Sequence, residues 1–245
     1  MSAIVLDSKV VKPIVMTGYV DSEPIPPIDD RFVDLGLPSG NLWARYNIGV
    51  NPNDLGTAAK WYGDKHSWAC ADDESSKSSF LWSNYKWKGS DDSHFTKYTS
   101  LNASAESGTA DGKRVIEQAD DIAYATYGAG AKVPTLEDWK ELYDNCTGED
   151  IVNYNGISGL RMLRLTSDIN GKELLLPLCN VIGKSIDYVV YNYPSCEKLF
   201  AKSTDDDAEF RYFQFWLEAE GGLDSWDYEE YSRYYWFYYR AIKQP

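Results

Sequence analysis

The sequence predicts an α+β domain with two helices followed by antiparallel strands, preceded by an extended N-terminal arm. Two segments between residues 115 and 146 carry apolar side chains at helical spacing, and an Asn-Gly pair at 170–171 separates two apolar runs. At 245 residues the chain fits one large domain or two small ones, and we find no internal repeat. We expect an arm over residues 1–30 and a domain over residues 31–245.

Residues 1–30 have too little apolar content for a core of their own. The first twenty residues are rich in β-branched side chains and are consistent with one or two strands. "DSEPIPPIDD" follows, and its three prolines cannot donate backbone hydrogen bonds and favour an extended linker. We expect this arm to be ordered by pairing with another element, for example a partner subunit.

From Phe32 the composition becomes globular. "WARYNIGV", residues 43–50, has strand character, and "NPND" after it predicts a turn. Residues 64–113 are rich in Ser, Asp, Gly and Lys, so we expect long loops there, anchored by Trp68, Trp82 and Trp87.

Two helices are predicted in the middle of the chain. In "VIEQADDIAYATYG", residues 115–128, Ile116 begins a helical spacing of apolar residues that Gly128 ends. In "TLEDWKELYDNC", residues 135–146, Thr135 is a good N-cap and Asp138 resembles the partner of a capping box. The apolar face of this second helix is formed by Leu136, Trp139, Leu142 and Tyr143.

Strands are predicted for the rest of the chain. "LRMLRLTSDINGKELLLPL" reads as a hairpin, because Asn170 and Gly171 both tolerate a positive φ. From Tyr188 onward, strand-like segments alternate with acidic loops. The stretch from Trp226 to Arg240 is unusually aromatic, with Tyr and Trp dominating.

The formal net charge of −14 argues against nucleic acid and anionic membrane surfaces as partners. We expect the acidic clusters Asp72-Asp73-Glu74, Asp91-Asp92 and Asp205-Asp206-Asp207 to be solvated loops. Not one of them has the D-x-D-x-D-G spacing of a dedicated calcium loop.

The sequence offers little for export, membrane insertion or metal binding. There is no apolar run of about 20 residues, and Asp7 and Lys9 interrupt the N-terminal apolar stretch, so we expect neither a membrane span nor a signal peptide. The cysteines form no C-x-x-C pair and there are only two histidines, His66 and His94, so we expect no metal and no cofactor. Buried free thiols are the default interpretation; one disulfide stays open, with partners unassigned, among Cys70, Cys146, Cys179 and Cys196.

Four blocks of the sequence, in order, resemble the major paralogous domain family of Bacteroidetes. They are "VDLGLPSGNLWARYNIGV" at 33–50, "YKWKG" at 85–89, "KVPTLEDWKELYDNC" at 132–146 and "NGISGLRMLRLTSDINGKELLLPL" at 155–178. The resemblance covers roughly Val33 to Gly183 and is weaker beyond, where "YYWFYYRAI" stands in place of the family's usual final strand.

This family is related to the C-type-lectin-like fold, in the branch shared with formylglycine-generating enzymes. The resemblance implies a loop-rich domain with two helices and a twisted antiparallel sheet. It also implies that "LGLPSG" is a turn that seats Trp43 in the core. We interpret the following signature residues as a folding element and not as a site: Gly36, Pro38, Gly40, Trp43, Pro134 and Trp139.

The aromatic C-terminal stretch favours a non-enzymatic recognition or structural module, because Tyr and Trp combine an apolar body with a polar tip. Tyr228, Tyr234, Trp236 and Tyr238 would share one face if they share a strand. The alternative is that such rings fill the core, which we favour for Trp236 and Tyr238 and leave open for Trp226, Tyr228 and Tyr231. The candidate ligand contacts are Trp226, Tyr228, Tyr231, Tyr234, Trp68, Trp82 and Trp87.

Two other functions fit the sequence less well. Calcium-dependent sugar binding is disfavoured, because the sequence lacks the Glu-Pro-Asn, Gln-Pro-Asp and Trp-Asn-Asp triplets of animal lectins. A formylglycine-generating enzyme needs reactive cysteines near the C-terminal core, whereas Cys179 and Cys196 precede that region and have no His or basic cluster nearby. We therefore expect no catalytic residues.

A recognition fold with an arm and without an export signal fits a bacteriophage virion protein made in the host cytoplasm. Head fibre, capsid decoration and tail receptor binding are the roles we expect. Residues 1–30 would bind other virion or surface-assembly proteins, in a homo-oligomer, and the domain would contact a cell-surface glycan or protein. The alternative is a bacterial cell-surface adhesin or carbohydrate-binding protein.

Overall fold

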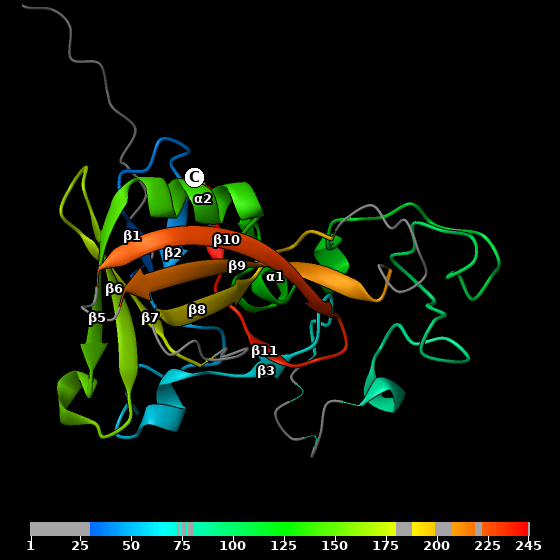
Figure 1. Ribbon diagram of the computed structural model, residues 1–245, viewed down its shortest axis with the longest axis horizontal. Coiled ribbons are helices and arrows are strands. Elements are labelled where there is room, and N and C mark those ends of the chain that lie inside the picture. The colour runs from blue at the N-terminus through cyan, green and yellow to red at the C-terminus, as the bar shows by residue number, and fades with distance from the viewer. Residues whose placement is uncertain are drawn as a thin grey trace, which may run out of the picture.

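The computed structural model describes residues 30–72, 74, 77, 81–179, 188–198, 207–218 and 222–244 (Figure 1). The predicted arm, residues 1–30, lies outside the described residues except for Asp30. Phe32, where the sequence becomes globular, is buried and begins the first strand.

The described residues form a mixed fold of two helices and several small antiparallel sheets, in agreement with the predicted α+β class. The strands divide among four sheets instead of one, in the orders β1-β2-β12-β4, β10-β9-β8, β11-β3 and β5-β6-β7. The element bounds are β1 Phe32–Asp34, β2 Leu42–Ala44, β3 Lys65–His66, α1 Ile122–Tyr127, β4 Ala131–Lys132, α2 Leu136–Asp144, β5 Cys146–Val152, β6 Arg161–Ser167, β7 Glu173–Pro177, β8 Tyr188–Pro194, β9 Glu209–Glu218, β10 Leu223–Ser232, β11 Phe237–Tyr238 and β12 Ile242–Lys243.

Helix α2 forms as its sequence predicts. The Thr135 hydroxyl accepts a hydrogen bond from the Asp138 backbone N–H, and the Asp138 carboxylate accepts one from the Thr135 N–H, which completes the capping box. The helix packs across the β8-β9-β10 sheet (Figure 1). Trp139 on its inner face is fully buried, and its ring lies 4.6 Å from that of Trp43.

The signature segment forms a turn that leads into the core. Gly40 N–H donates to the Leu37 carbonyl and closes a turn, and Gly36 adopts a φ of +69° that favours glycine. The turn docks on α2, because Ser39 donates to the Glu141 carboxylate through both its N–H (2.8 Å) and its hydroxyl (2.6 Å). Trp43 follows on β2 and is fully buried, while Pro38 lies exposed on the turn.

The C-terminal end of the described chain is built into the N-terminal sheet. Ile242 on β12 pairs with Trp43 on β2 and with Lys132 on β4. The buried guanidinium of Arg240 donates to the carbonyls of Ala44 (2.8 Å) and Leu175 (2.7 Å), so one side chain joins two separate sheets. Segments about 200 residues apart thus hold each other in place.

The predicted hairpin at Asn170-Gly171 is confirmed. Strands β6 and β7 pair antiparallel, with Leu163 opposite Leu176 and Leu165 opposite Leu174, and all four side chains are buried. Gly171 has a φ of +70° in the connecting turn.

Two segments form less regular structure than predicted. The strand expected at 43–50 ends at Ala44, and the predicted turn at Asn51–Asp54 is present. The helix expected at 115–128 begins only at Ile122, because the Asp121 carboxylate caps it by accepting from the N–H groups of Ala123 and Tyr124. Gln118–Asp120 before it form a short 3-10 turn, and further upstream the Ile116 N–H donates to the Cys196 carbonyl.

The expectation that every acidic cluster is solvated was wrong for two carboxylates. Glu74 is buried and accepts from the Ser67 N–H at 2.6 Å. Asp207 is fully buried and pairs with the equally buried ammonium of Lys198. It also accepts from the backbone N–H groups of Ser100 (2.8 Å) and Leu101 (3.1 Å), so it anchors a long loop to the sheet.

We expect Asp207→Ala to lower the free energy of unfolding by about 3–5 kcal/mol, because it leaves the Lys198 charge buried without a partner. Burial alone would raise the pKa of Asp207, but the hydrogen bonds from Lys198 and Ser104 outweigh it and lower that pKa. The stabilising contribution is therefore present above the unfolded carboxyl pKa of about 4 and is lost as the pH falls through the folded value. Urea unfolding of both proteins at pH 7 and pH 3 measures the difference.

The double variant Lys198→Met/Asp207→Leu is the control, since it removes both charges and should lose less stability than the single variant. If Asp207→Ala is as stable as the double variant or more stable, the buried charges of Lys198 and Asp207 do not depend on each other.

Candidate ligand-binding cleft

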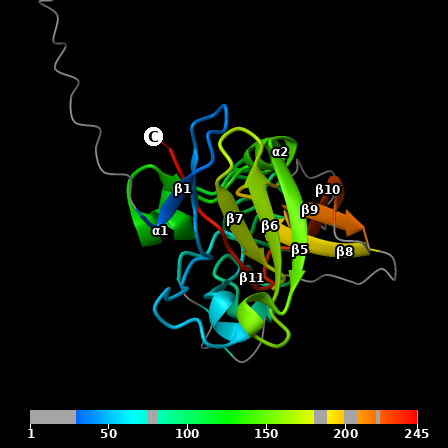
Figure 2. The same ribbon diagram turned by 90° about the vertical axis from the view of Figure 1, so that its left-hand side faces the viewer.

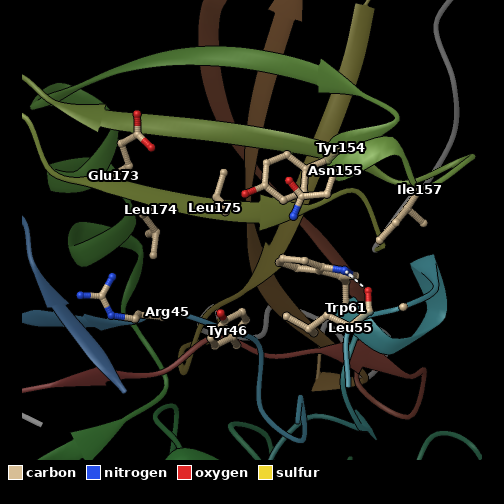
Figure 3. A pocket seen from close by; sticks show the side chains of 11 residues that line it. Arg45, Tyr46, Leu55, Trp61, Tyr154, Asn155, Ile157, Glu173, Leu174 and Leu175 are labelled. Atoms are coloured by element: carbon tan, nitrogen blue, oxygen red, sulfur yellow. Dashed lines mark hydrogen bonds between the residues drawn. The ribbon is translucent and has the colours of Figure 1, made fainter. Parts of the chain in front are cut away.

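An open cleft of about 520 Å³ lies between the β5–β6 hairpin and the loop that follows β2 (Figure 3). Figure 2 shows the tip of this hairpin beside the short helical turn at Ala58–Trp61. The volume falls within the range of about 300–1,000 Å³ typical of small-molecule sites. The lining residues are Arg45, Tyr46, Leu55, Gly56, Trp61, Tyr154, Asn155, Ile157, Glu173, Leu174 and Leu175.

Three aromatic rings form the apolar part of the cleft. Trp61 lies at the centre and is only 5% exposed; its indole N–H donates to the Leu55 carbonyl at 3.1 Å, which fixes the ring. Tyr154 stands edge-on to it at a centroid distance of 5.4 Å, and Tyr46 lies tilted at 5.9 Å. Trp61 is part of the core beneath the cleft, so Tyr46 and Tyr154, which are partly exposed, are the rings that a ligand can contact most fully.

The hairpin tip has the backbone that places Tyr154 and Asn155 at the cleft. Asn153 and Asn155 are both left-handed, with φ of +56° and +52°, a conformation that Asn tolerates better than most residues. The Asn153 side chain accepts from the Gly159 N–H at 2.9 Å and closes the tip. A rigid turn therefore carries one ring and one amide into the cleft.

Polar groups are distributed around these rings. The Nε of Arg45 donates to the Asp30 carbonyl at 2.9 Å, and the side chain is exposed. Glu173 is exposed and lies 3.7 Å from Arg164. Among the described residues, the side chains of Tyr46, Tyr154 and Asn155 make no hydrogen bond, so their polar atoms are available to a ligand.

A second cavity of about 500 Å³ adjoins the first, because Arg45 and Tyr46 line both. Its other walls come from the segment around Val50 and Pro52 and from the end of α1 at Thr126 and Tyr127. Arg45 and Tyr46 thus form a wall that the two cavities share.

One sequence-predicted contact was wrong. Trp68 is 0% exposed, its indole N–H donates to the Ser195 carbonyl at 3.1 Å, and its ring packs on Tyr98 and Phe210. It is a core residue with no free face. Trp87 is partly buried, with its N–H bound to the Ala69 carbonyl at 2.8 Å.

The C-terminal aromatics do not form the single face considered from the sequence. Strand β10 ends at Ser232, so Tyr228 shares no strand with Tyr234, Trp236 or Tyr238. Trp226 stacks on Phe213 at 5.3 Å and also packs against Tyr143 of α2.

Tyr228 and Tyr231 lie on opposite faces of β10. Tyr228 is 42% exposed and lies beneath the Arg211 guanidinium at 4.5 Å. Tyr231 packs on the other side against Phe237 and Tyr235. The strand alternation that separates the two rings also prevents them from contacting one ligand together.

Tyr234 and Trp82 are brought together from segments far apart in sequence, with ring centroids 5.9 Å apart. Trp82 also packs on the buried Phe95. Both remain partly exposed, which keeps them as a secondary candidate surface. Trp236 lies beneath the Lys65 ammonium at 4.5 Å, and Tyr238 lies 5.7 Å from Tyr62; both are partly buried.

The thiols are free, as the default interpretation predicted, and Cys70, Cys146 and Cys196 are buried. Burial raises the pKa of Cys70 and Cys146 to about 12. In the described part of the chain, no cluster of three or more His, Cys, Asp or Glu side chains is arranged to hold a metal ion. No helix among the described residues has the length and apolar character needed to cross a bilayer.

No protein-family model matches the chain, and searches of the curated proteins and of the solved structures gave no significant match.

Sequence reasoning missed every residue of the cleft, because the wall from Arg45 to Trp61 lies more than 90 residues before the walls at Tyr154–Ile157 and Glu173–Leu175. One signal was available: in "NYNGISG" an aromatic residue stands among turn-forming Asn and Gly residues. Tyr154 packs on Trp61 and stays partly exposed, so one side of its ring lies at the cleft.

We expect Cys70 and Cys146 to resist iodoacetamide in the folded protein at pH 8. With a pKa of about 12, only about one thiol in ten thousand is the reactive thiolate at that pH, and burial also blocks access. Mass spectrometry of peptides from folded and urea-unfolded protein measures the labelling. Rapid modification of either cysteine in the folded protein would contradict the buried environment.

Proposed function

We propose that this chain is a non-enzymatic recognition module on a C-type-lectin-like scaffold of the Bacteroidetes major paralogous domain type. The observation that carries the proposal is the open cleft, where fixed rings of Trp61 and Tyr154 lie beside polar side chains without partners among the described residues. Such a combination of rigid aromatics and adaptable polar groups is typical of binding surfaces. Its position on a hairpin tip and loops, supported by packed sheets, fits recognition.

The thiol environment supports recognition over formylglycine-generating chemistry. That chemistry needs a thiolate, whereas burial raises the pKa of Cys70 and Cys146 to about 12 and that of Cys196 above its usual range. Desolvation is the largest cause in each case.

The assembly that we propose is a bacteriophage virion, with the domain on its outer surface and residues 1–30 as the attachment. The net charge of −14 supports an exterior position, because a strongly charged surface stays soluble and resists self-association. In this arrangement the cleft faces the surroundings of the particle, and the domain binds a host-cell surface component as a head fibre, decoration or receptor-binding protein.

Blocking the cleft tests recognition. The backbone of Gly56 lines the cleft in a conformation open to any residue, and no atom lies within 4 Å of where its Cβ would be. We expect Gly56→Trp to fold normally and to lose at least about tenfold in apparent affinity for intact Bacteroidetes cells, as measured with labelled full-length protein by flow cytometry.

Gly222→Trp is the matched control, since Gly222 also has open space around its Cβ position and lies outside the cleft lining. Binding that survives in the cleft variant and is lost in the control would show that recognition occurs elsewhere. If the wild-type protein binds no cells, the proposed recognition function is wrong.

Deleting residues 1–29 tests the attachment role. We expect the full-length protein to be a homo-oligomer and the shortened protein to be a folded monomer, because the arm is the segment that we assign to assembly. Native mass spectrometry and circular dichroism measure mass and folding. A shortened protein that unfolds would place the arm within the domain, and an unchanged oligomer would locate the interface in the domain itself.

A further inference from the structure

The two adjoining cavities indicate more than a generic binding surface. We propose that together they form a two-subsite groove for a neutral oligosaccharide of at least two sugar units, bound without a metal ion. This inference rests on the proposed recognition function and names the ligand class of the same site. It is argued from the rings, the polar groups, the charges and the shared wall of the two cavities.

The first cavity has the two surfaces that a pyranose ring requires. One side of such a ring carries C–H groups, and these pack on aromatic rings like those of Tyr46 and Tyr154, which are partly exposed at the cleft. Its edge carries hydroxyls, each of which donates and accepts hydrogen bonds. Asn155 offers both a donor and an acceptor, Glu173 offers acceptors, and Arg45 offers donors, all on the cleft lining (Figure 3).

The charges of the groove favour a neutral ligand. The charged residues that line the two cavities are two of each sign, Arg31 and Arg45 against Asp30 and Glu173, so the lining itself carries no net charge to attract a phosphate or a cationic group. The net charge of −14 on the whole chain repels anionic ligands at long range. Uncharged polyols are attracted through hydrogen bonds alone.

The backbone beside the cleft disfavours an extended peptide. Peptides usually bind an exposed sheet edge by continuing its hydrogen bonds. Strand β7 lines the cleft at Glu173, Leu174 and Leu175, but the Leu175 carbonyl already accepts from Arg240 at 2.7 Å. The edge that a peptide would extend is therefore partly occupied from within.

The shared wall sets the minimum ligand length. Arg45 and Tyr46 line both cavities, so a ligand held over Trp61 has a second hollow of about 500 Å³ directly beyond them. That hollow is lined by Val50, Pro52 and Tyr127, which provide apolar surface for the next sugar ring, and by polar residues at its rim, Asp30, Arg31 and Asn51. A monosaccharide would leave this surface empty.

The experiment begins with full-length protein on a printed array of neutral and acidic oligosaccharides. Isothermal titration then uses the mono-, di- and trisaccharide of the best neutral series. We expect the disaccharide to bind at least about tenfold more tightly than the monosaccharide. Val50→Trp, which fills the second hollow at a partly exposed position, should remove this gain and leave monosaccharide affinity unchanged. Gly56→Trp should abolish both, and Gly222→Trp neither.

Treated cells separate this inference from the proposed function. Periodate cleaves vicinal diols and should abolish binding to cells, whereas proteinase K should leave it intact. If Gly56→Trp weakens cell binding but periodate treatment does not, the ligand is not a saccharide, and the proposed recognition function still holds. Binding with no gain from mono- to disaccharide would overturn the second subsite. A protein that binds neither cells nor sugars would overturn both proposals, and binding preserved in EDTA is required throughout.

Discussion

The fold depends on one buried side chain, Trp139 of α2. Its indole N–H donates to the Pro194 carbonyl at 3.2 Å, so the helix is tied to the end of β8 by a directional bond as well as by packing. Removing a buried Trp from such a site costs about 3–5 kcal/mol in typical proteins, a large part of the stability of a domain. The ring meets residues from three other elements, Trp43, Tyr193, Phe213 and Phe215.

Buried charged side chains hold the loops in place, as Trp139 holds the helix and the sheets together. Arg233 is fully buried, donates to the carbonyls of Tyr98 and Lys97 at 2.8 Å each, and lies 3.7 Å from the centre of the Phe95 ring. A guanidinium can satisfy several carbonyls at fixed angles, and irregular backbone leaves such carbonyls without a ladder partner. Residues 81–113 therefore hold a defined shape with little regular secondary structure.

Local signals explain what the sequence could predict. The capping box at Thr135 and Asp138 and the turn at Gly171 are decided within a few residues, and both form as expected. The shorter helix at Ile122 shows the limit of such signals. Helical spacing extended from Ile116, but Ile116 pairs with Cys196 in the structure, and that tertiary hydrogen bond overrides the local preference.

Aromatic composition could not distinguish core from surface. Trp68 stands in a polar, loop-like stretch and is fully buried, because the loops fold over it and the Ser195 carbonyl binds its N–H. Tyr154 stands in a similar stretch and is only partly buried, because at the hairpin tip Trp61 covers one side of it and the other side lies at the cleft. The difference is made by contacts across more than 100 residues, which periodicity in a single chain does not encode.

The two walls of the cleft are held in position by one buried side chain, Arg240. Arg240 bonds both to Ala44, next to Arg45 and Tyr46, and to Leu175 on the opposite wall. One buried cation thus links the two sides of the cleft through fixed hydrogen bonds. Binding to a site with fixed walls loses less conformational entropy, because its side chains and loops are already ordered. For a ligand held by only a few hydrogen bonds, this difference in entropy decides whether the affinity is high enough to measure.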